Sequence, residues 1–244
     1  MTSAAGFIPL RTSAPRSRVE WELEDGDSVP VSPSHNDAVD ELSSVFKAWI
    51  SDAGRHASVE HDVAVRWDPA NPKVGVDPDL AIFEPPPAHR DELTSVMTWR
   101  EGQSPPLLAV EVVSPSNPRK DYAVSPEKYA ANGAQELWVF DPRLVGPRST
   151  GGPFRLQVWN RAADGAFERT YAGPGPARST VLDAWIVPAQ EGRRLRVSGD
   201  SEGRSLWPTR EERLLAEKES AVAEKESALA EIAALKAELA RRPK

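Results

Sequence analysis

Two acidic residues, Asp79 and Glu111, have the types and positions that a metal site needs. Glu111 is the one charged residue of the apolar run 107–113, whose length and β-branched side chains predict a central buried strand. A buried carboxylate is costly without a partner cation, which could be an Arg, a Lys or a metal ion. Asp79 opens a second short strand, 79–83, so the two carboxylates could meet at one end of a sheet.

Oxygen ligands of this kind suit Mg²⁺, which takes one or two protein carboxylates and keeps several water molecules. Because side chains alternate along a strand, Glu111 is expected to share one face of the sheet with Leu107, Ala109 and Val113. A structural salt bridge would pair and perturb carboxylates as readily as a metal ion would. Spacing alone therefore leaves both interpretations open.

The apolar pattern predicts the elements that must position these residues. Spacings of three and four predict an amphipathic helix from Asn36 to about Gly54, and alternation predicts a half-buried strand at 58–67. A second helix is predicted at 126–132, where it stops before Gly133. The remaining strands are expected at 136–140, 154–159 and 167–171. The order α-β-β-β-α-β-β-β indicates an α/β (α+β) domain.

The predicted domain covers residues 35–190 and has extensions on both sides. Residues 1–34 are rich in Ser, Pro and charge and predict a flexible arm, and 191–208 are expected to form a linker. From residue 209 to 244 the composition shifts to Ala, Glu, Lys and Leu, which predicts a long helix.

An apolar heptad pattern runs along this last segment. Leu215, Val222 and Leu229 repeat every seven residues, although Lys218 and Lys225 interrupt the first half of the pattern. Ile232, Leu235 and Leu239 join it further along. We expect a coiled coil that forms a homodimer, and the alternative is a solvated single helix.

Composition limits the chemistry that remains possible. The 244 residues contain no Cys, which excludes disulfides, thiolate zinc sites and a cysteine nucleophile. No run approaches the roughly 20 apolar residues of a membrane span, and no signal peptide is recognisable, so we expect a cytoplasmic protein without membrane partners. The net charge is −7, yet residues 143–204 carry 10 Arg against 6 acidic side chains. This segment could face phosphates, or its arginines could be ordinary surface residues.

Three strings together resemble a known family. They are PDLAIF at 78–83, LLAVEVVSPSNPRKD at 107–121 and KYAANGAQELWVFDP at 128–142, and they are similar to the Uma-type restriction endonucleases of the PD-(D/E)XK nuclease superfamily. The resemblance implies a restriction-endonuclease-like αβββαβ core with additional strands. It also implies that Asp79, Glu111 and the Val112 carbonyl bind Mg²⁺, or Mn²⁺, and that the chain hydrolyses DNA phosphodiester bonds.

The sequence departs from this pattern at the catalytic lysine. The superfamily places a Lys two residues after the Glu, where this chain has Val113, and family members commonly move it to the position of Ser125. We therefore take Lys128 as the catalytic candidate and Lys120, on the preceding loop, as a further one. Without such a lysine the domain would be an impaired nuclease that acts as a coiled-coil scaffold.

Other residues match the family without a clear chemical role. His35 precedes the first helix, where it could approach the site or remain a surface histidine. Glu136, Trp138 and Asp141 also fit the family pattern, and we interpret them as structural residues.

Overall fold

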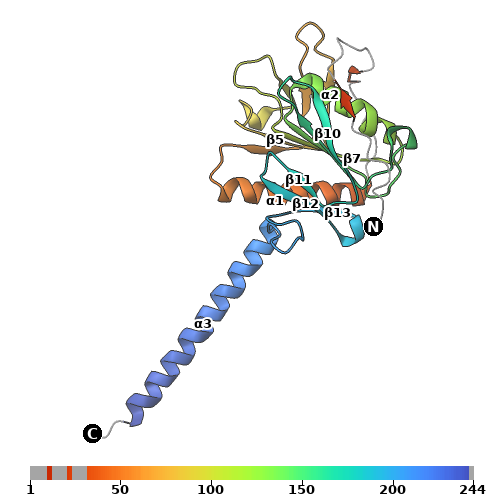
Figure 1. The fold of residues 1–244 in the computed structure, drawn as a ribbon. Coiled ribbons are helices and arrows are strands. Elements are labelled where there is room, and N and C mark those ends of the chain that lie inside the picture. The colour runs from red at the N-terminus through yellow and green to blue at the C-terminus, as the bar shows by residue number, and fades with distance from the viewer. Residues whose placement is uncertain (1–9, 13–20, 24–31, 242–244) are drawn as a thin grey trace. The chain divides into compact units, whose positions relative to one another are not determined.

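The computed structural model describes residues 10–12, 21–23 and 32–241, and the chain divides into two compact units, Met1–Trp207 and Pro208–Lys244 (Figure 1). Helices of the larger unit are α1 (Pro33–Asp52), the short η2 (Arg90–Glu92), the π-helical η3 (Lys120–Val124), α2 (Ser125–Asn132), η4 (Arg148–Thr150) and η5 (Gln190–Gly192). Its strands are β1 (Arg11–Thr12), β2 (Ser58–Glu60), β3 (Ala64–Arg66), β4 (Gly75–Val76), β5 (Leu80–Phe83), β6 (Ser95–Met97), β7 (Leu108–Val112), β8 (Glu136–Phe140), β9 (Leu156–Arg161), β10 (Phe167–Gly173), β11 (Ala177–Ser179), β12 (Ala184–Ala189) and β13 (Arg194–Ser198).

A seven-stranded mixed sheet forms the centre of the larger unit. Its strand order is β1-β10-β9-β8-β7-β5-β2, with β7 and β8 parallel and the other neighbours antiparallel. Following the chain through this sheet gives α1, then β2, β5 and β7, then α2, then β8, β9 and β10. This order confirms the predicted α/β class and its αβββαβ core. Two three-stranded sheets, β11-β12-β13 and β4-β3-β6, are added to it.

Helices α1 and α2 lie on opposite faces of the large sheet (Figure 1). Phe46 of α1 packs edge-on against Trp138 of β8, with ring centroids 5.6 Å apart, in a core that also contains Val110 and Val112. Ala109 and Val113 belong instead to the core beneath α2, so Glu111 faces α2 as the alternation predicts. Leu107, which precedes β7, packs against the α1 side and departs from that expectation.

The single strand expected at 58–67 is two strands in different sheets. β2 pairs with β5 in the large sheet, whereas β3 pairs with β4 and β6. Between them Asp62 has a φ of +57°, a left-handed conformation that Asp tolerates better than most residues. The alternation of residue types through 58–67 gives no sign of this break, because it continues across Asp62.

The domain is longer than the predicted 35–190. β13 pairs with β12, and Trp207 stacks on Trp49 with ring centroids 5.7 Å apart, so much of the expected linker 191–208 belongs to the fold. Upstream, β1 pairs with β10, and Trp21 is buried against Trp67. Residues 32–34, also assigned to the predicted arm, form the N-cap and the first residues of α1. Arm residues 1–9, 13–20 and 24–31 lie outside the described part of the chain.

The smaller unit is the helix α3 (Arg210–Arg241). Its first turn is closed reciprocally: the Glu212 amide donates to Thr209 Oγ1 at 3.1 Å, and the Thr209 amide donates to the Glu212 carboxylate at 2.8 Å. Large apolar side chains remain exposed along the helix, namely Leu214, Leu215, Val222, Leu229, Ile232 and Leu235. In the part of the chain that the structure describes, no helix has the length and apolar character of a membrane span.

Candidate active site

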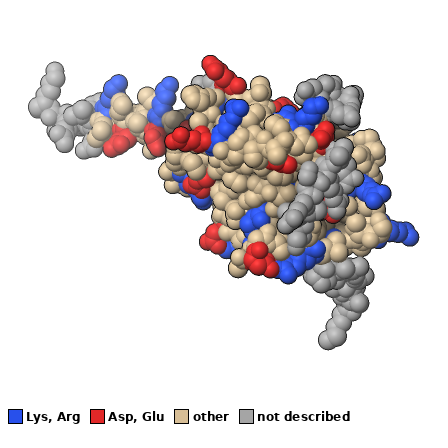
Figure 2. Space-filling model, turned by 90° about the horizontal axis from the view of Figure 1, so that it is seen from above, with Lys and Arg blue, Asp and Glu red and all other residues tan. Residues whose placement is uncertain are grey.

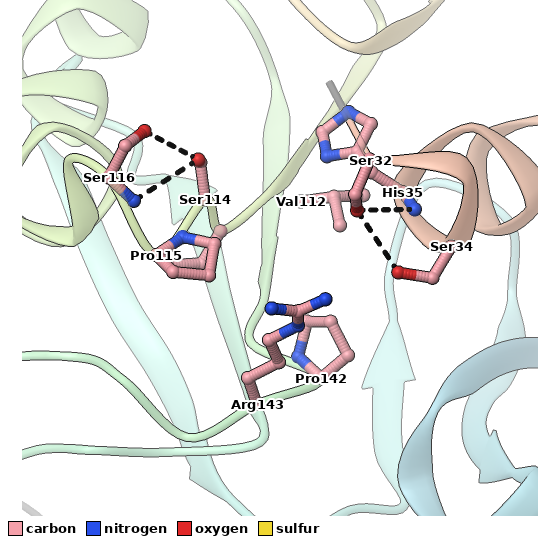
Figure 3. A pocket seen from close by; sticks show the side chains of 10 residues that line it. Ser32, Ser34, His35, Val112, Ser114, Pro115, Ser116, Pro142 and Arg143 are labelled. Atoms are coloured by element: carbon pink, nitrogen blue, oxygen red, sulfur yellow. Dashed lines mark hydrogen bonds between the residues drawn. The ribbon is translucent and has the colours of Figure 1, made fainter. Parts of the chain in front are cut away.

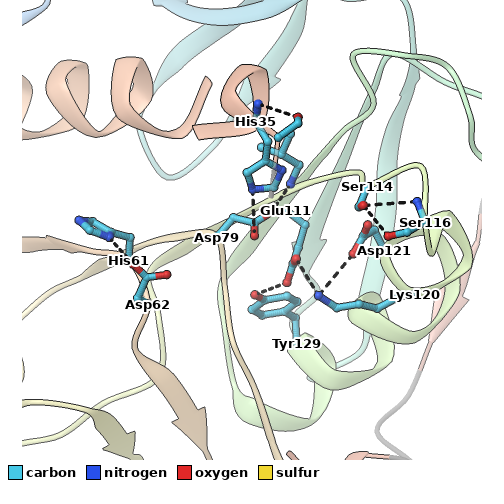
Figure 4. A network of polar contacts seen from close by, with 12 residues as sticks. His35, His61, Asp62, Asp79, Glu111, Ser114, Ser116, Lys120, Asp121 and Tyr129 are labelled. Carbon is cyan, nitrogen blue, oxygen red and sulfur yellow. Dashed lines mark hydrogen bonds and ion pairs between the residues drawn. The ribbon is translucent and has the colours of Figure 1, made fainter. Parts of the chain in front are cut away.

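The Glu111 carboxylate is fully buried, with 0% of the residue exposed, and its two oxygens have different surroundings (Figure 4). Oε1 accepts a hydrogen bond of 2.8 Å from the Tyr129 hydroxyl. Oε2 accepts no hydrogen bond from any described residue and lies 3.7 Å from Lys120 Nζ. Since a buried carboxylate oxygen normally has at least one donor, Oε2 has unused capacity to bind a cation.

Asp79 and Glu111 meet at one end of the sheet. Leu80 of β5 pairs with Val110 of β7 in antiparallel register, so one further step places Asp79 opposite Glu111. The amide of Val112 donates to Asp79 Oδ2 at 2.7 Å, which fixes the carboxylate beside the end of β7. The structure thus brings together the two carboxylates that the sequence singled out.

His35 reaches the other oxygen of Asp79 from the first turn of α1. Its Nε2 lies 3.4 Å from Asp79 Oδ1, and its backbone amide donates to Oγ of the N-cap residue Ser32 at 3.3 Å. The hydrogen bond to Asp79 raises the pKa of His35 above its ordinary value, so the charged imidazolium persists to higher pH. His35 therefore belongs to the site and is not an isolated surface histidine.

Lys120 comes from a widened turn ahead of α2. Residues of η3 form a π-helical segment that continues into α2, so helical structure begins six residues before the predicted start at Pro126. A π turn changes the phase of the helix, and here Lys120 and Tyr129 both contact Glu111. The Lys120 side chain is 42% exposed, so part of it is open to solvent.

Asp121 is a third acidic residue of the site, and no sequence pattern singled it out. It is buried, with Oδ1 3.8 Å from Lys120 Nζ. Burial and the charge of Glu111 raise the pKa of Asp121 well above its usual range, and Lys120 lowers it. The sequence shows that an acidic residue follows Lys120, but the inward orientation of the Asp121 side chain depends on the π turn.

The remaining lysine candidates occupy less favourable positions. Lys128 is buried in α2. Its charge lowers the pKa of Glu111, but the charge of Lys120 lowers that pKa more. Val113 and Ser125, which stand where the superfamily and its relatives carry the lysine, are both buried. The structure thus brings Lys120 to the carboxylates, whereas the role of Lys128 remains a prediction.

The donor set fits a divalent cation. Burial raises the pKa of Glu111 to about 7, with Asp79 adding to the rise, so a further positive charge would stabilise the ionised form. Within the described residues no cluster of three or more His, Cys, Asp or Glu could hold a metal. Two carboxylates suffice for Mg²⁺ when water and a backbone carbonyl, such as that of Val112, complete its shell.

Arginines of the segment 143–204 mostly serve the fold. Arg155 and Arg161 donate to backbone carbonyls, and Arg169 lies over aromatic rings. Five others pair with carboxylates: Arg178, Arg193, Arg194, Arg196 and Arg204. On the face shown in Figure 2, charges of both signs are interspersed among uncharged residues. The positive balance of this segment is therefore not gathered into one large basic surface on that face.

Two clefts open on either side of His35. One of about 320 Å³ is lined by His35, Asp40, His61 and Asp79 among others. The other, of about 400 Å³, is lined by His35, Val112 and Arg143 together with serines and prolines (Figure 3). Asp79 lines the smaller cleft, Val112 at the end of β7 lines the larger one, and His35 lines both.

Comparisons with known proteins give a family match and matches to solved structures. The family model Uma2, described as "Putative restriction endonuclease", matches residues 10–145, more than half of the chain. Among solved structures, the chain is similar to a protein of Anabaena variabilis described as "a putative nuclease belonging to DUF820". Identity is 15%, the TM-score is 0.44, and the match covers 64% of this chain and 76% of the other. No curated protein matches the chain.

Proposed function

Because this chain belongs to the Uma2 family of restriction-endonuclease-like proteins, we propose that it is a Mg²⁺- or Mn²⁺-dependent endonuclease that hydrolyses DNA. One observation carries the proposal: the buried Oε2 of Glu111 lacks a hydrogen bond from any described residue and lies beside Asp79 and a partly exposed lysine. A carboxylate kept only for stability would be expected to have its acceptor sites filled.

Asp79, Glu111 and the carbonyl of Val112 are the groups that would hold the metal ion. A bound divalent cation lowers the pKa of water and neutralises charge on a phosphodiester. The chain's own residues keep its ligands in place. The Val112 amide and His35 hold the two oxygens of Asp79, and the Tyr129 hydroxyl holds Oε1 of Glu111.

Lys120 is the residue we assign to the catalytic lysine, in preference to Lys128. Its ammonium lies within 4 Å of both Glu111 and Asp121, and its side chain is partly exposed. These carboxylates raise the pKa of Lys120 above its ordinary value, so the side chain stays positively charged at any working pH. A fixed cation at this point can stabilise the negative charge that develops on a phosphate during hydrolysis.

Plasmid cleavage tests the proposal directly. Purified full-length protein is incubated with supercoiled plasmid and Mg²⁺ or Mn²⁺, beside the variant Glu111→Ala and the matched control Glu101→Ala. Glu101 is an exposed acid outside the clefts. We expect metal-dependent nicking by the wild type and the control, and a loss of at least about 100-fold in Glu111→Ala.

The competing function is a scaffold built on an inactive nuclease fold. The missing lysines at Val113 and Ser125 favour it, whereas the position of Lys120 beside Glu111 favours catalysis. No nicking of any nucleic acid, together with no metal binding in calorimetry, would establish the scaffold and reject the enzyme.

We further propose that α3 joins two copies of the chain. Leu215, Val222 and Leu229 are each about half exposed on one heptad line, and such side chains are usually covered by a partner helix. A dimer would present two sites to the two strands of a duplex. Light scattering of the full chain should give twice the mass per chain, and Leu229→Glu should halve it, whereas Ser227→Glu should not. Full-length protein that is monomeric would refute the dimer.

A further inference from the structure

The cleft of about 400 Å³ beside the site has an unusual arginine. Arg143 follows Asp141-Pro142 at the end of β8, and the backbone amide of Arg143 donates a hydrogen bond of 3.2 Å to Asp141 Oδ1. Its guanidinium makes no hydrogen bond or ion pair with any described residue, and Arg143 is exposed. Eight other arginines of the segment 143–204 have structural partners. Arg143 differs from them, because its backbone is held by Asp141 while its guanidinium has no described partner. Such a group is available for a ligand.

Two pairs of serines line the cleft together with this arginine, one pair on each side (Figure 3). Ser114 Oγ lies 2.8 Å from Ser116 Oγ on one wall, and Ser32 Oγ lies 3.1 Å from Ser34 Oγ on the other. Each pair shares one hydrogen bond, which leaves donor or acceptor capacity in the cleft. Hydroxyls and a guanidinium together are typical ligands of nucleic-acid backbones.

Apart from His35, the rest of the lining is apolar. Pro115 and Pro142 lie between the serines and the arginine, and Val112 connects the cleft to the proposed metal site. Rigid proline rings offer a surface for a deoxyribose, whose sugar face is apolar. The cleft therefore combines contacts for a sugar with contacts for a phosphate, immediately beside the residue whose amide fixes Asp79.

We propose that this cleft binds one nucleotide of the substrate strand next to the scissile phosphate, with Arg143 on its backbone phosphate. This inference rests on the proposed nuclease function and names how that site holds its substrate. Arg143 acts as a binding residue, because it lines the cleft with His35 and Val112 and is not among the residues that contact the carboxylates. Its loss should weaken binding without removing the chemical step.

Binding is measured by fluorescence anisotropy with the full-length protein, a labelled DNA duplex and EDTA, which prevents cleavage. Arg143→Ala is compared with Arg148→Ala, since Arg148 is also exposed and without a partner among the described residues, but it lies outside the cleft. We expect Arg143→Ala to raise Kd about 10-fold and to reduce the slope of log Kd against log salt by about one. Arg148→Ala should stay within about twofold of the wild type.

Kinetics supply a second measurement. In Mn²⁺, Arg143→Ala should raise KM with kcat within about twofold of the wild type, as expected for lost substrate binding. Equal Kd and KM values for the two arginine variants would overturn the inference and leave the nuclease proposal intact. A wild-type protein that neither binds the duplex nor nicks the plasmid would contradict both the cleft inference and the nuclease proposal. Calorimetry with inorganic phosphate alone should show no tight binding; tight binding that Arg143→Ala abolishes would assign the cleft to a free anion.

Discussion

Two glutamates, Glu111 and Glu136, are both fully buried on the neighbouring parallel strands β7 and β8, yet their carboxylates are bonded very differently. Both oxygens of Glu136 are saturated by protein donors. Oε1 accepts from Trp138 Nε1 and Ser179 Oγ at 2.6 Å each, and Oε2 accepts from Asn160, from Thr180 and from the amide of Val181. Glu111 has one hydrogen bond, and its second oxygen has only a lysine at 3.7 Å.

Burial alone therefore does not identify a functional carboxylate. Glu136 joins β8 to β9 and to the segment after β11, so its charge is used to hold the fold together. Glu111 faces the opposite side of the sheet and keeps acceptor capacity that the described protein does not use. Unfilled acceptor capacity on a buried, charged group is what distinguishes a ligand of a cation from a structural residue.

Stability should separate the two glutamates most clearly. Glu136→Ala leaves several buried donors without an acceptor, and the free energy of unfolding should fall by at least about 3 kcal/mol. Glu111→Gln removes a poorly compensated buried charge and should change it by no more than about 1 kcal/mol in either direction. Urea denaturation followed by circular dichroism measures both. Similar losses of stability in the two variants would contradict the distinction between a structural Glu136 and a functional Glu111.

Lysine variants should affect cleavage next most strongly. Lys120→Ala removes the cation beside Glu111 and should lower kcat about 100-fold. Lys128→Met keeps an apolar stem in a buried position and should have a much smaller effect. Rates are measured on supercoiled plasmid at saturating Mn²⁺, with melting temperatures as a folding control. The reverse order would restore Lys128 as the catalytic lysine.

A hydroxyl deletion should have an intermediate effect. Tyr129→Phe removes the hydrogen bond to Oε1 of Glu111 and nothing else, so cleavage should fall about 10-fold. Unfolding free energy should fall by about 1 kcal/mol. Wild-type activity in this variant would show that the orientation of Glu111 does not depend on Tyr129.

The imidazole of His35 should matter least. It contacts Asp79, whose other oxygen the Val112 amide holds in any case. His35→Gln should lower kcat about threefold, which is below the effect of one lost ligand-orienting bond. A loss as large as that of Lys120→Ala, measured on the same plasmid, would give His35 a direct role in proton transfer.

Much of this arrangement was predictable from the sequence because it depends on local patterns. A charge inside an apolar strand is visible at Glu111, and the order of helices and strands along the chain follows from the spacing of apolar runs. Asp79 could be placed near it because an antiparallel neighbour brings its first residue to the end of β7.

Other features depend on tertiary geometry that no local pattern contains. The π turn sets the direction of the Lys120 and Asp121 side chains. The sequence predicted a regular helix that begins only at Pro126, so this direction could not be foreseen. The break at Asp62 is hidden because polar and apolar residues alternate through both β2 and β3. Local sequence does not show how differently Glu136 and Glu111 are bonded, because donors such as Ser179 and Tyr129 come from other elements.

Metal binding by Glu111 is the central claim, and calorimetry with Mn²⁺ tests it without requiring turnover. The wild type and Glu111→Gln are titrated under identical conditions, and circular dichroism checks that both are folded. We expect one Mn²⁺ site per chain in the wild type and at least about a 100-fold weaker affinity in Glu111→Gln. Equal affinities in two folded proteins, or no binding by the wild type, would contradict it.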